Sequence, residues 1–168
     1  YEFFREQDPY ICFFLRWGMP GYLEKDNYIN QVLTGFKIPH NKLIFLDKLV
    51  ILKQVIVPDQ KYGYIRDYFQ NPEPVFRTFL RSFRFKSDIP KGFENTERIY
   101  VSRSKMPINS GRAIGEELFE KYLISNGYKI FHPEYYSLFQ QLTVYSNAKK
   151  IIFLSGSSLH SCILLPDL

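Results

Sequence analysis

The sequence has few cysteines and no long hydrophobic run. Its 168 residues include two cysteines, Cys12 and Cys162, too few for the disulfide framework of a small secreted domain. We expect both thiols to be reduced and buried, which is typical of a reducing compartment. No apolar run approaches the ~20 residues of a membrane-spanning helix. The histidines His40, His132 and His160 lack the spacing of a zinc site, so we expect no bound metal.

The chain also lacks a strong excess of charge. Lys and Arg number 22, Asp and Glu number 17, and the net charge of +5 allows an anionic partner without requiring one. Apolar residues make up 45% and charged residues 23%, which excludes wholesale disorder, and the length suffices for one core. Because the sequence starts at Tyr1 without Met and ends three residues after an apolar run, we expect a fragment of a longer protein.

The N-terminal half alternates apolar segments with turns. Short apolar runs predict strands at Tyr10–Arg16, Lys42–Leu46 and Val50–Val57. Apolar residues with helical spacing predict a helix at Leu23–Leu33. A second helix is expected to begin near Pro74, since proline suits the first helical turn.

The C-terminal half has a regular alternation of strands and helices. We predict strands at Arg98–Val101, Tyr128–Phe131 and Ile151–Leu154, and helices at Glu116–Ser125 and Ser137–Ser146. This order predicts a parallel sheet flanked by helices. The turn-rich residues 87–97 are interpreted as a linker between an N-terminal subdomain, residues 1–86, and a second domain, residues 98–168.

Two segments that follow predicted strands are candidates for an anion site. In parallel α/β sheets, ligands bind at the carboxyl ends of the strands, where Arg103 and the loop Ser155–Ser158 are expected. The fork of an arginine suits a phosphate, and a helix that begins in the loop would direct N–H groups at an anion. A surface arginine and an ordinary capped turn stay open as alternatives. Arg112 and Glu116 have the i, i+4 spacing of an exposed ion pair.

Several segments of the C-terminal half match the motifs of one enzyme family. The run Arg98–Arg103 fits a (K/R)-I-Y-I-S-R strand, Gly127–Glu134 fits G-F-x-V-x-x-P-E, and Ser155–Leu159 stands where many members carry H-G-A-G-L. Arg112 and Glu116 fit an arginine and a glutamate around the start of the next helix. These motifs, in this order, resemble the catalytic domain of glycosyltransferase family 61. The resemblance extends over residues 35–168.

The helix and loop near the end of the chain add to the resemblance and also depart from it. Gln141 and Ala148 fit the family's Q-x-x-L-F-x-x-A helix. The histidine of H-G-A-G-L is replaced by Ser155 and its second glycine by Ser158.

The resemblance implies an α/β fold of the GT-B type, in which a Rossmann-like parallel sheet flanked by helices accompanies part of an N-terminal, acceptor-side subdomain. Residues 98–168 would be a truncated donor-binding domain. The implied reaction is inverting and metal-independent, with no cofactor. It moves a hexosyl or pentosyl group from a nucleotide-diphosphate donor, expected to be UDP-linked, to a glycan acceptor in capsular-polysaccharide or other glycan synthesis.

The resemblance also implies the residues that bind the nucleotide sugar, without assigning a catalytic base. They are Arg103, Arg112, Glu116, Ser155, Gly156, Ser157, Ser158, Leu159 and His160. The expected location is the cytoplasm of a bacterium or the Golgi or endoplasmic-reticulum lumen of a eukaryote, and peripheral membrane association stays open.

Alternative functions come from the basic and aromatic residues and from the loop. Arg77, Arg81 and Arg84, with Lys86, form a stripe that could hold a nucleic-acid backbone, although the solvated face of an amphipathic helix has the same pattern. Since no aromatic RNA-recognition motif is present, we expect no nucleic-acid partner. A polysaccharide pyruvyl transferase has a related fold, but the segment 158–160 lacks the arginine of its R-L-H motif. An inactive domain that keeps the fold is a third alternative.

Overall fold

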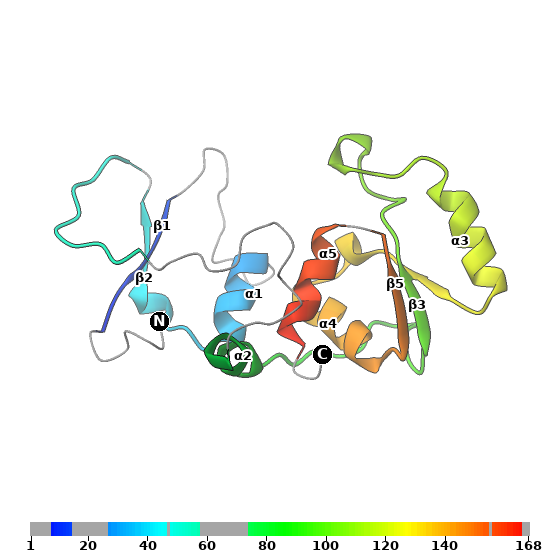
Figure 1. Cartoon of the computed structure of the whole chain (residues 1–168), viewed down its shortest axis with the longest axis horizontal. Helices are drawn as coiled ribbons and strands as arrows, with labels where there is room; N and C mark the ends of the chain where they lie inside the picture. Colours follow the sequence, from blue (N-terminus) through cyan, green and yellow to red (C-terminus); the bar gives the residue numbers. More distant parts are fainter. Residues whose placement is uncertain (1–7, 15–26, 47, 58–73, 155, 166–168) are drawn as a thin grey trace.

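The computed structural model describes residues 8–14, 27–46, 48–57, 74–154 and 156–165 (Figure 1). The strands are β1 (Ile11–Phe14), β2 (Leu43–Leu46), β3 (Arg98–Val101), β4 (Lys129–Phe131) and β5 (Lys150–Phe153). The α-helices are α1 (Tyr28–Gly35), α2 (Pro74–Arg81), α3 (Glu116–Ser125), α4 (Leu138–Asn147) and α5 (Ser157–His160). Short 3-10 helices lie at η2 (His40–Lys42), η3 (Ile108–Ser110), η4 (Pro133–Tyr135) and η5 (Ser161–Leu164).

Two small parallel sheets give the chain an α/β fold. β1 pairs with β2, and the larger sheet has the order β4-β3-β5. In the larger sheet, Tyr100 of β3 lies opposite Ile130 of β4 and Ile152 of β5. The chain leaves β3 for β4 on one side and later returns to β5 on the other side. The order of strands therefore reverses at β3, and ligands of doubly wound sheets bind at such a point.

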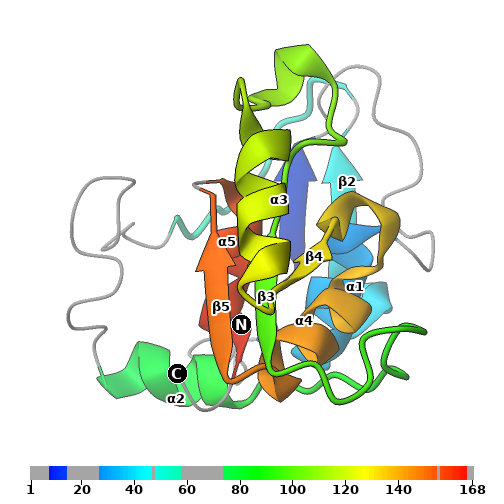
Figure 2. The ribbon, with the colours of Figure 1, turned by 90° about the vertical axis from the view of Figure 1, so that its right-hand side faces the viewer.

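Helices cover both faces of the larger sheet. Figures 1 and 2 show α3 on one face and α4 on the other. β3 serves both layers, because successive side chains of a strand point to opposite faces. Ile99 and Val101 belong to the core cluster together with α4, whereas Tyr100 and Ser102 contact Glu116 of α3. The side chains of these four consecutive residues, 99–102, are almost fully buried.

The core lies between the sheet and α4 and is rich in aromatic rings. Phe131 of β4 makes edge-on contacts with Tyr145 of α4 at 5.7 Å and with Phe93 at 5.0 Å between ring centroids. Phe83, just after α2, belongs to the same cluster. Residues before and within the predicted linker therefore pack into the core of the C-terminal half. The boundaries of the two subdomains stay a prediction.

The first helix is fastened to the C-terminal half. The buried side chain of Gln31 accepts a hydrogen bond from the backbone N–H of Phe139 at 3.0 Å, one of the amides that a helix leaves unpaired in its first turn. Ser137 and Gln140 complete a capping box at the same end of α4. The hydrogen bond from Phe139 to Gln31 thereby joins α1 to the N-terminus of α4.

Most of the predicted elements of the C-terminal half are confirmed. The strand Arg98–Val101 and the helix Glu116–Ser125 have the predicted bounds. The predicted strand at Val50–Val57 is wrong: this segment is irregular and exposed, and it pairs with no strand in the part of the chain that the structure describes. Residues 23–26 of the predicted helix Leu23–Leu33 lie outside the described residues. In the described part α1 begins at Tyr28, because the side chain of Asn27 caps it by accepting a hydrogen bond from the backbone N–H of Ile29 at 2.9 Å.

Two further expectations concern thiols and membranes. Cys162 is buried as predicted, but Cys12 is exposed, because it lies on the small β1-β2 sheet, away from the core cluster. Among the described helices, none combines the length and apolar character needed to cross a membrane.

Candidate functional site

A cavity of about 350 Å³ lies at the carboxyl ends of the strands of the larger sheet. Its volume falls within the range of roughly 300–1,000 Å³ that is usual for small-molecule sites. Residues after all three strands line it, together with α1 and α4: Tyr28, Val101, Arg103, Met106, Pro133, Glu134, Gln141, Leu154, Gly156, Ser157, Ser158 and Ser161. The cavity therefore occupies the place where the topology predicts a ligand.

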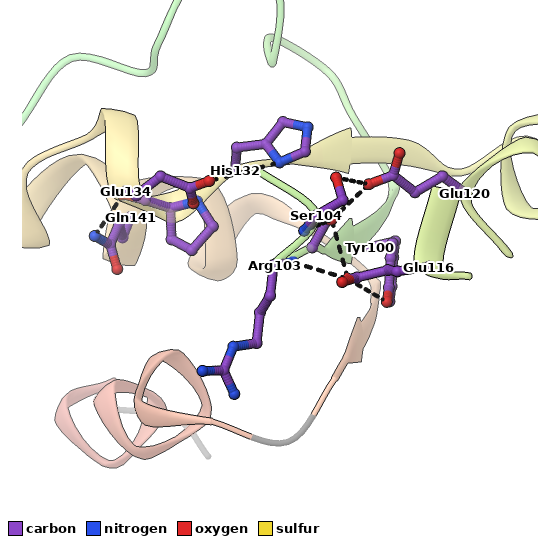
Figure 3. A network of polar contacts seen from close by, with 10 residues as sticks. Tyr100, Arg103, Ser104, Glu116, Glu120, His132, Glu134 and Gln141 are labelled. Atoms are coloured by element: carbon purple, nitrogen blue, oxygen red, sulfur yellow. Dashed lines mark hydrogen bonds and ion pairs between the residues drawn. The ribbon is translucent and has the colours of Figure 1, made fainter. Parts of the chain in front are cut away.

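The guanidinium of Arg103 lies between two glycines. A Cβ on Gly111 would stand 2.8 Å from Nη2 of Arg103, and a Cβ on Gly156 would stand 2.8 Å from Nη1. Gly111 also has the left-handed φ of +81°, and Nη2 donates to the carbonyl oxygen of Ser110. Figure 3 shows the side chain extended toward the segment after β5. Glycine at both positions leaves the space that this guanidinium occupies.

A buried carboxylate holds the backbone at Arg103. Oε1 of Glu116 accepts hydrogen bonds from the backbone N–H of Arg103 at 2.8 Å and from the Tyr100 hydroxyl at 2.8 Å, and it lies 3.0 Å from Oγ of Ser102 (Figure 3). The residue is 4% exposed. Because bonds to an ionised acceptor are stronger than neutral ones, Glu116 fixes the position from which the arginine side chain starts.

A second carboxylate extends this network. Oε1 of Glu120, one turn along α3, lies 2.5 Å from Oγ of Ser102 and 2.6 Å from Oγ of Ser104. Burial raises the pKa of Tyr100, and its hydrogen bond to Glu116 raises that pKa further, since a phenolate would face a carboxylate. The phenol is therefore neutral at physiological pH and acts as a hydrogen-bond donor.

The turn after β4 brings another carboxylate to the cavity. Glu134 lies on η4, and Gln141 of α4 donates from Nε2 to the carbonyl oxygens of Pro133 at 2.9 Å and Tyr136 at 3.0 Å. Nδ1 of His132 lies 3.9 Å from Oε1 of Glu134. The conformation of the turn is thus set by α4, and both Glu134 and Gln141 line the cavity.

The structure brings some of the predicted site residues together. Arg103, Gly156, Ser157 and Ser158 line the cavity, whereas Glu116 lies behind Arg103 and holds its backbone. The loop forms a helix of four residues, α5, that continues into η5. Ser155 lies outside the described residues.

Other predicted site residues lie outside the cavity lining. Arg112 pairs with Glu117, so the predicted exposed pair of Arg112 with Glu116 is wrong: Glu116 turns inward to the polar groups that follow β3. Leu159 is half-buried and His160 is exposed. The participation of Arg112, Leu159 and His160 in donor binding stays a prediction.

Several residues that line the cavity were not predicted as site residues from the sequence. Glu134 and Gln141 stand in segments that match family motifs, and the position of Glu134 just after a strand was a usable signal. Met106 follows β3 in the same turn as Arg103, whereas Tyr28 gave no such signal, because packing between distant segments brings α1 to the cavity. Across the described residues, no three His, Cys, Asp or Glu side chains gather closely enough to share a metal ion.

Comparison with known families decides the assignment. The model of the Glycosyltransferase 61 family matches residues 9–167. The chain belongs to glycosyltransferase family 61. The predicted resemblance is thereby confirmed, and the chain is a glycosyltransferase domain, whose substrates are a sugar donor and a glycan acceptor. Searches of curated proteins and of solved structures found no significant match to this family 61 domain.

Proposed function

We propose that this family 61 domain binds the nucleoside diphosphate of a sugar donor, UDP-linked, in the cavity beside Arg103. The observation that supports the proposal is the guanidinium of Arg103, held between Gly111 and Gly156 at the wall of the cavity. A guanidinium fork matches the oxygens of a phosphate. The hydroxyls of Ser157 and Ser158, which line the same cavity, can donate to the same anion.

The proposed reaction is an inverting transfer without a metal ion. A hydroxyl oxygen of the glycan acceptor forms a bond to the anomeric carbon, while the bond from that carbon to the diphosphate oxygen breaks. The diphosphate takes the electron pair, and the acceptor oxygen loses its proton to a base. Because negative charge grows on the departing diphosphate, donors preorganised around it lower the barrier.

The buried network supports this role of Arg103. Glu116 fixes the backbone N–H of Arg103, and it accepts from Tyr100 in the interior. A donor that is already in place need not be reorganised as charge develops. We therefore propose Glu116 as a positioning residue rather than a group that contacts the donor.

The proposal includes the arrangement of the whole enzyme. Residues 98–168 would form part of the donor domain of a GT-B enzyme, and residues 1–86 part of the acceptor side. The product would be a capsular polysaccharide or another glycan.

A thermal-shift panel tests the proposal. The chain is heated with UDP, GDP, CMP or a short RNA at two salt concentrations. A ligand at a hundred times its Kd stabilises the folded state by ~2.7 kcal/mol. We expect a selective response to UDP with modest salt dependence. A response to RNA alone that disappears in high salt would instead support a nucleic-acid-binding domain, and silence toward every nucleotide would contradict the proposed donor site.

A further inference from the structure

We propose that Glu134 forms a second subsite of the cavity, which binds two neighbouring hydroxyl groups on a sugar ring of the donor. The inference rests on the proposed function, because it assigns the hydroxyl-bearing part of the same ligand. The cavity of about 350 Å³ is lined by two side chains of opposite charge, Arg103 after β3 and Glu134 after β4.

The carboxylate of Glu134 has unused capacity to accept hydrogen bonds. An ionised carboxylate offers about four acceptor positions and no donor. Nδ1 of His132 is 3.9 Å from Oε1 of Glu134, beyond hydrogen-bond distance. The side chain of Glu134 is 22% exposed, so most of it is shielded from bulk solvent. A ligand hydroxyl that donates to this carboxylate replaces water at little cost, whereas a phosphate would be repelled.

The order of the strands gives the distance between the two subsites. β3 and β4 are neighbouring parallel strands, which lie about 4.8 Å apart, so the loops that carry Arg103 and Glu134 begin side by side. A ligand that fills the cavity must therefore carry an anionic group and a pair of hydroxyls a few ångströms apart. A nucleotide sugar meets this requirement, since its diphosphate is flanked by a ribose and by the sugar to be transferred.

The turn that carries Glu134 is held in place. Gln141 donates to the carbonyl oxygens of Pro133 and Tyr136, on both sides of Glu134. The amide comes from α4, whose N-terminus is fixed by Gln31 of α1. A carboxylate on a fixed turn discriminates ligands better than one on a free loop, because less conformational freedom is lost on binding. Gln141 is thus a positioning residue for Glu134.

Titration calorimetry with three ligands tests the subsite. UDP, its 2′-deoxy analogue and UDP-glucose are titrated into the wild-type chain, Glu134→Gln and the control Glu94→Gln. The variant Glu134→Gln keeps the size of the side chain but replaces one acceptor oxygen with a donor group. Glu94 is an exposed carboxylate whose Oε2 accepts from the backbone N–H of Gly92 at 2.6 Å, and it is not among the residues that line the cavity.

Two results support the inference and separate the two sources of hydroxyls. If Glu134 binds the ribose, Glu134→Gln weakens UDP binding about tenfold or more. The same substitution then reduces the affinity for the 2′-deoxy analogue much less. If the transferred sugar is bound, the variant leaves UDP unchanged and weakens UDP-glucose by a similar factor. Gln141→Leu, which removes both bonds to the turn, is expected to show the same selectivity. A purely structural role would weaken all three ligands equally.

Other results overturn the inference. Wild-type affinity of Glu134→Gln for all three ligands, with Glu94→Gln also unchanged, would exclude Glu134 from the site, while UDP binding by the wild type would leave the proposed function standing. An equal loss for every ligand would also contradict hydroxyl recognition. Absence of binding to the wild-type chain would instead refute the proposed function, and the subsite with it.

Discussion

Replacing Glu116 by alanine should destabilise the fold strongly, although the residue is charged. Its Oε1 accepts from the backbone N–H of Arg103 and the hydroxyl of Tyr100, both at 2.8 Å, and lies 3.0 Å from the Ser102 hydroxyl. The side chain is almost fully buried. Glu116→Ala therefore leaves the Tyr100 hydroxyl and the backbone N–H of Arg103 without their acceptor.

The size of the loss follows from these contacts. A hydrogen bond to a charged group contributes about 1.5–3 kcal/mol, and a buried group that loses its partner costs about 1–3 kcal/mol. Water that enters the space left by the side chain recovers part of this. From the two bonds to Oε1 that are lost, we expect a net loss of about 3–5 kcal/mol, which is a large fraction of the stability of a domain.

Urea unfolding followed by circular dichroism measures the effect, with Glu117→Ala as the matched control. Glu117 is the next residue of α3 and pairs with Arg112 at the surface, so its removal should leave the midpoint close to wild type. Glu116→Gln, which keeps an acceptor oxygen, should fall between the two. A loss of less than about 1 kcal/mol for Glu116→Ala would refute the role of this carboxylate as a buried anchor.

Three further predictions concern titration, thiol reactivity and the glycine beside Arg103. Because the folded state raises the pKa of Tyr100 above its ordinary value of 10.0, the unfolded chain ionises first, and stability should fall as the pH rises above 10. Urea unfolding at pH 8 and at pH 11 tests this prediction, and a higher midpoint at pH 11 than at pH 8 would contradict it. Cys12 should react with a thiol reagent in the folded state, whereas Cys162, buried and with a pKa raised to about 11, should react only on unfolding. Fast reaction of the folded variant Cys12→Ser, which retains Cys162, with the thiol reagent would refute the protection of Cys162. Gly156→Ala should weaken UDP binding without lowering the melting temperature, since its Cβ would displace the end of the flexible Arg103 side chain; unchanged affinity would contradict the close approach.

Local signals in the sequence predicted the C-terminal elements well. Gly127, with φ of +78°, marked the end of α3, and Ser137 marked the start of α4 through its capping box. These signals act within a few residues, so a single sequence contains them. The position of Arg103 and of the loop at 156–158 followed from the same alternation of strands and helices.

Contacts between distant segments could not be predicted in the same way. The spacing of Arg112 and Glu116 favoured a surface pair. The direction in which Glu116 points depends instead on polar groups of β3 and of the two residues after it, thirteen or more positions away in the sequence. Gln31 and Phe139 are separated by 108 positions, and no local pattern predicts their bond. Val50–Val57 has a strand's composition, yet composition does not supply a partner strand.

The central claim is that Arg103 binds the diphosphate of the donor, and titration of UDP into the wild-type chain and Arg103→Ala tests it most directly. Arg103→Lys, which keeps the charge but loses the fork, is the conservative control. We expect UDP to bind the wild type and to bind Arg103→Ala about tenfold or more weakly, with Arg103→Lys between them and all three chains folded. Equal affinity of the wild type and Arg103→Ala for UDP would contradict the account.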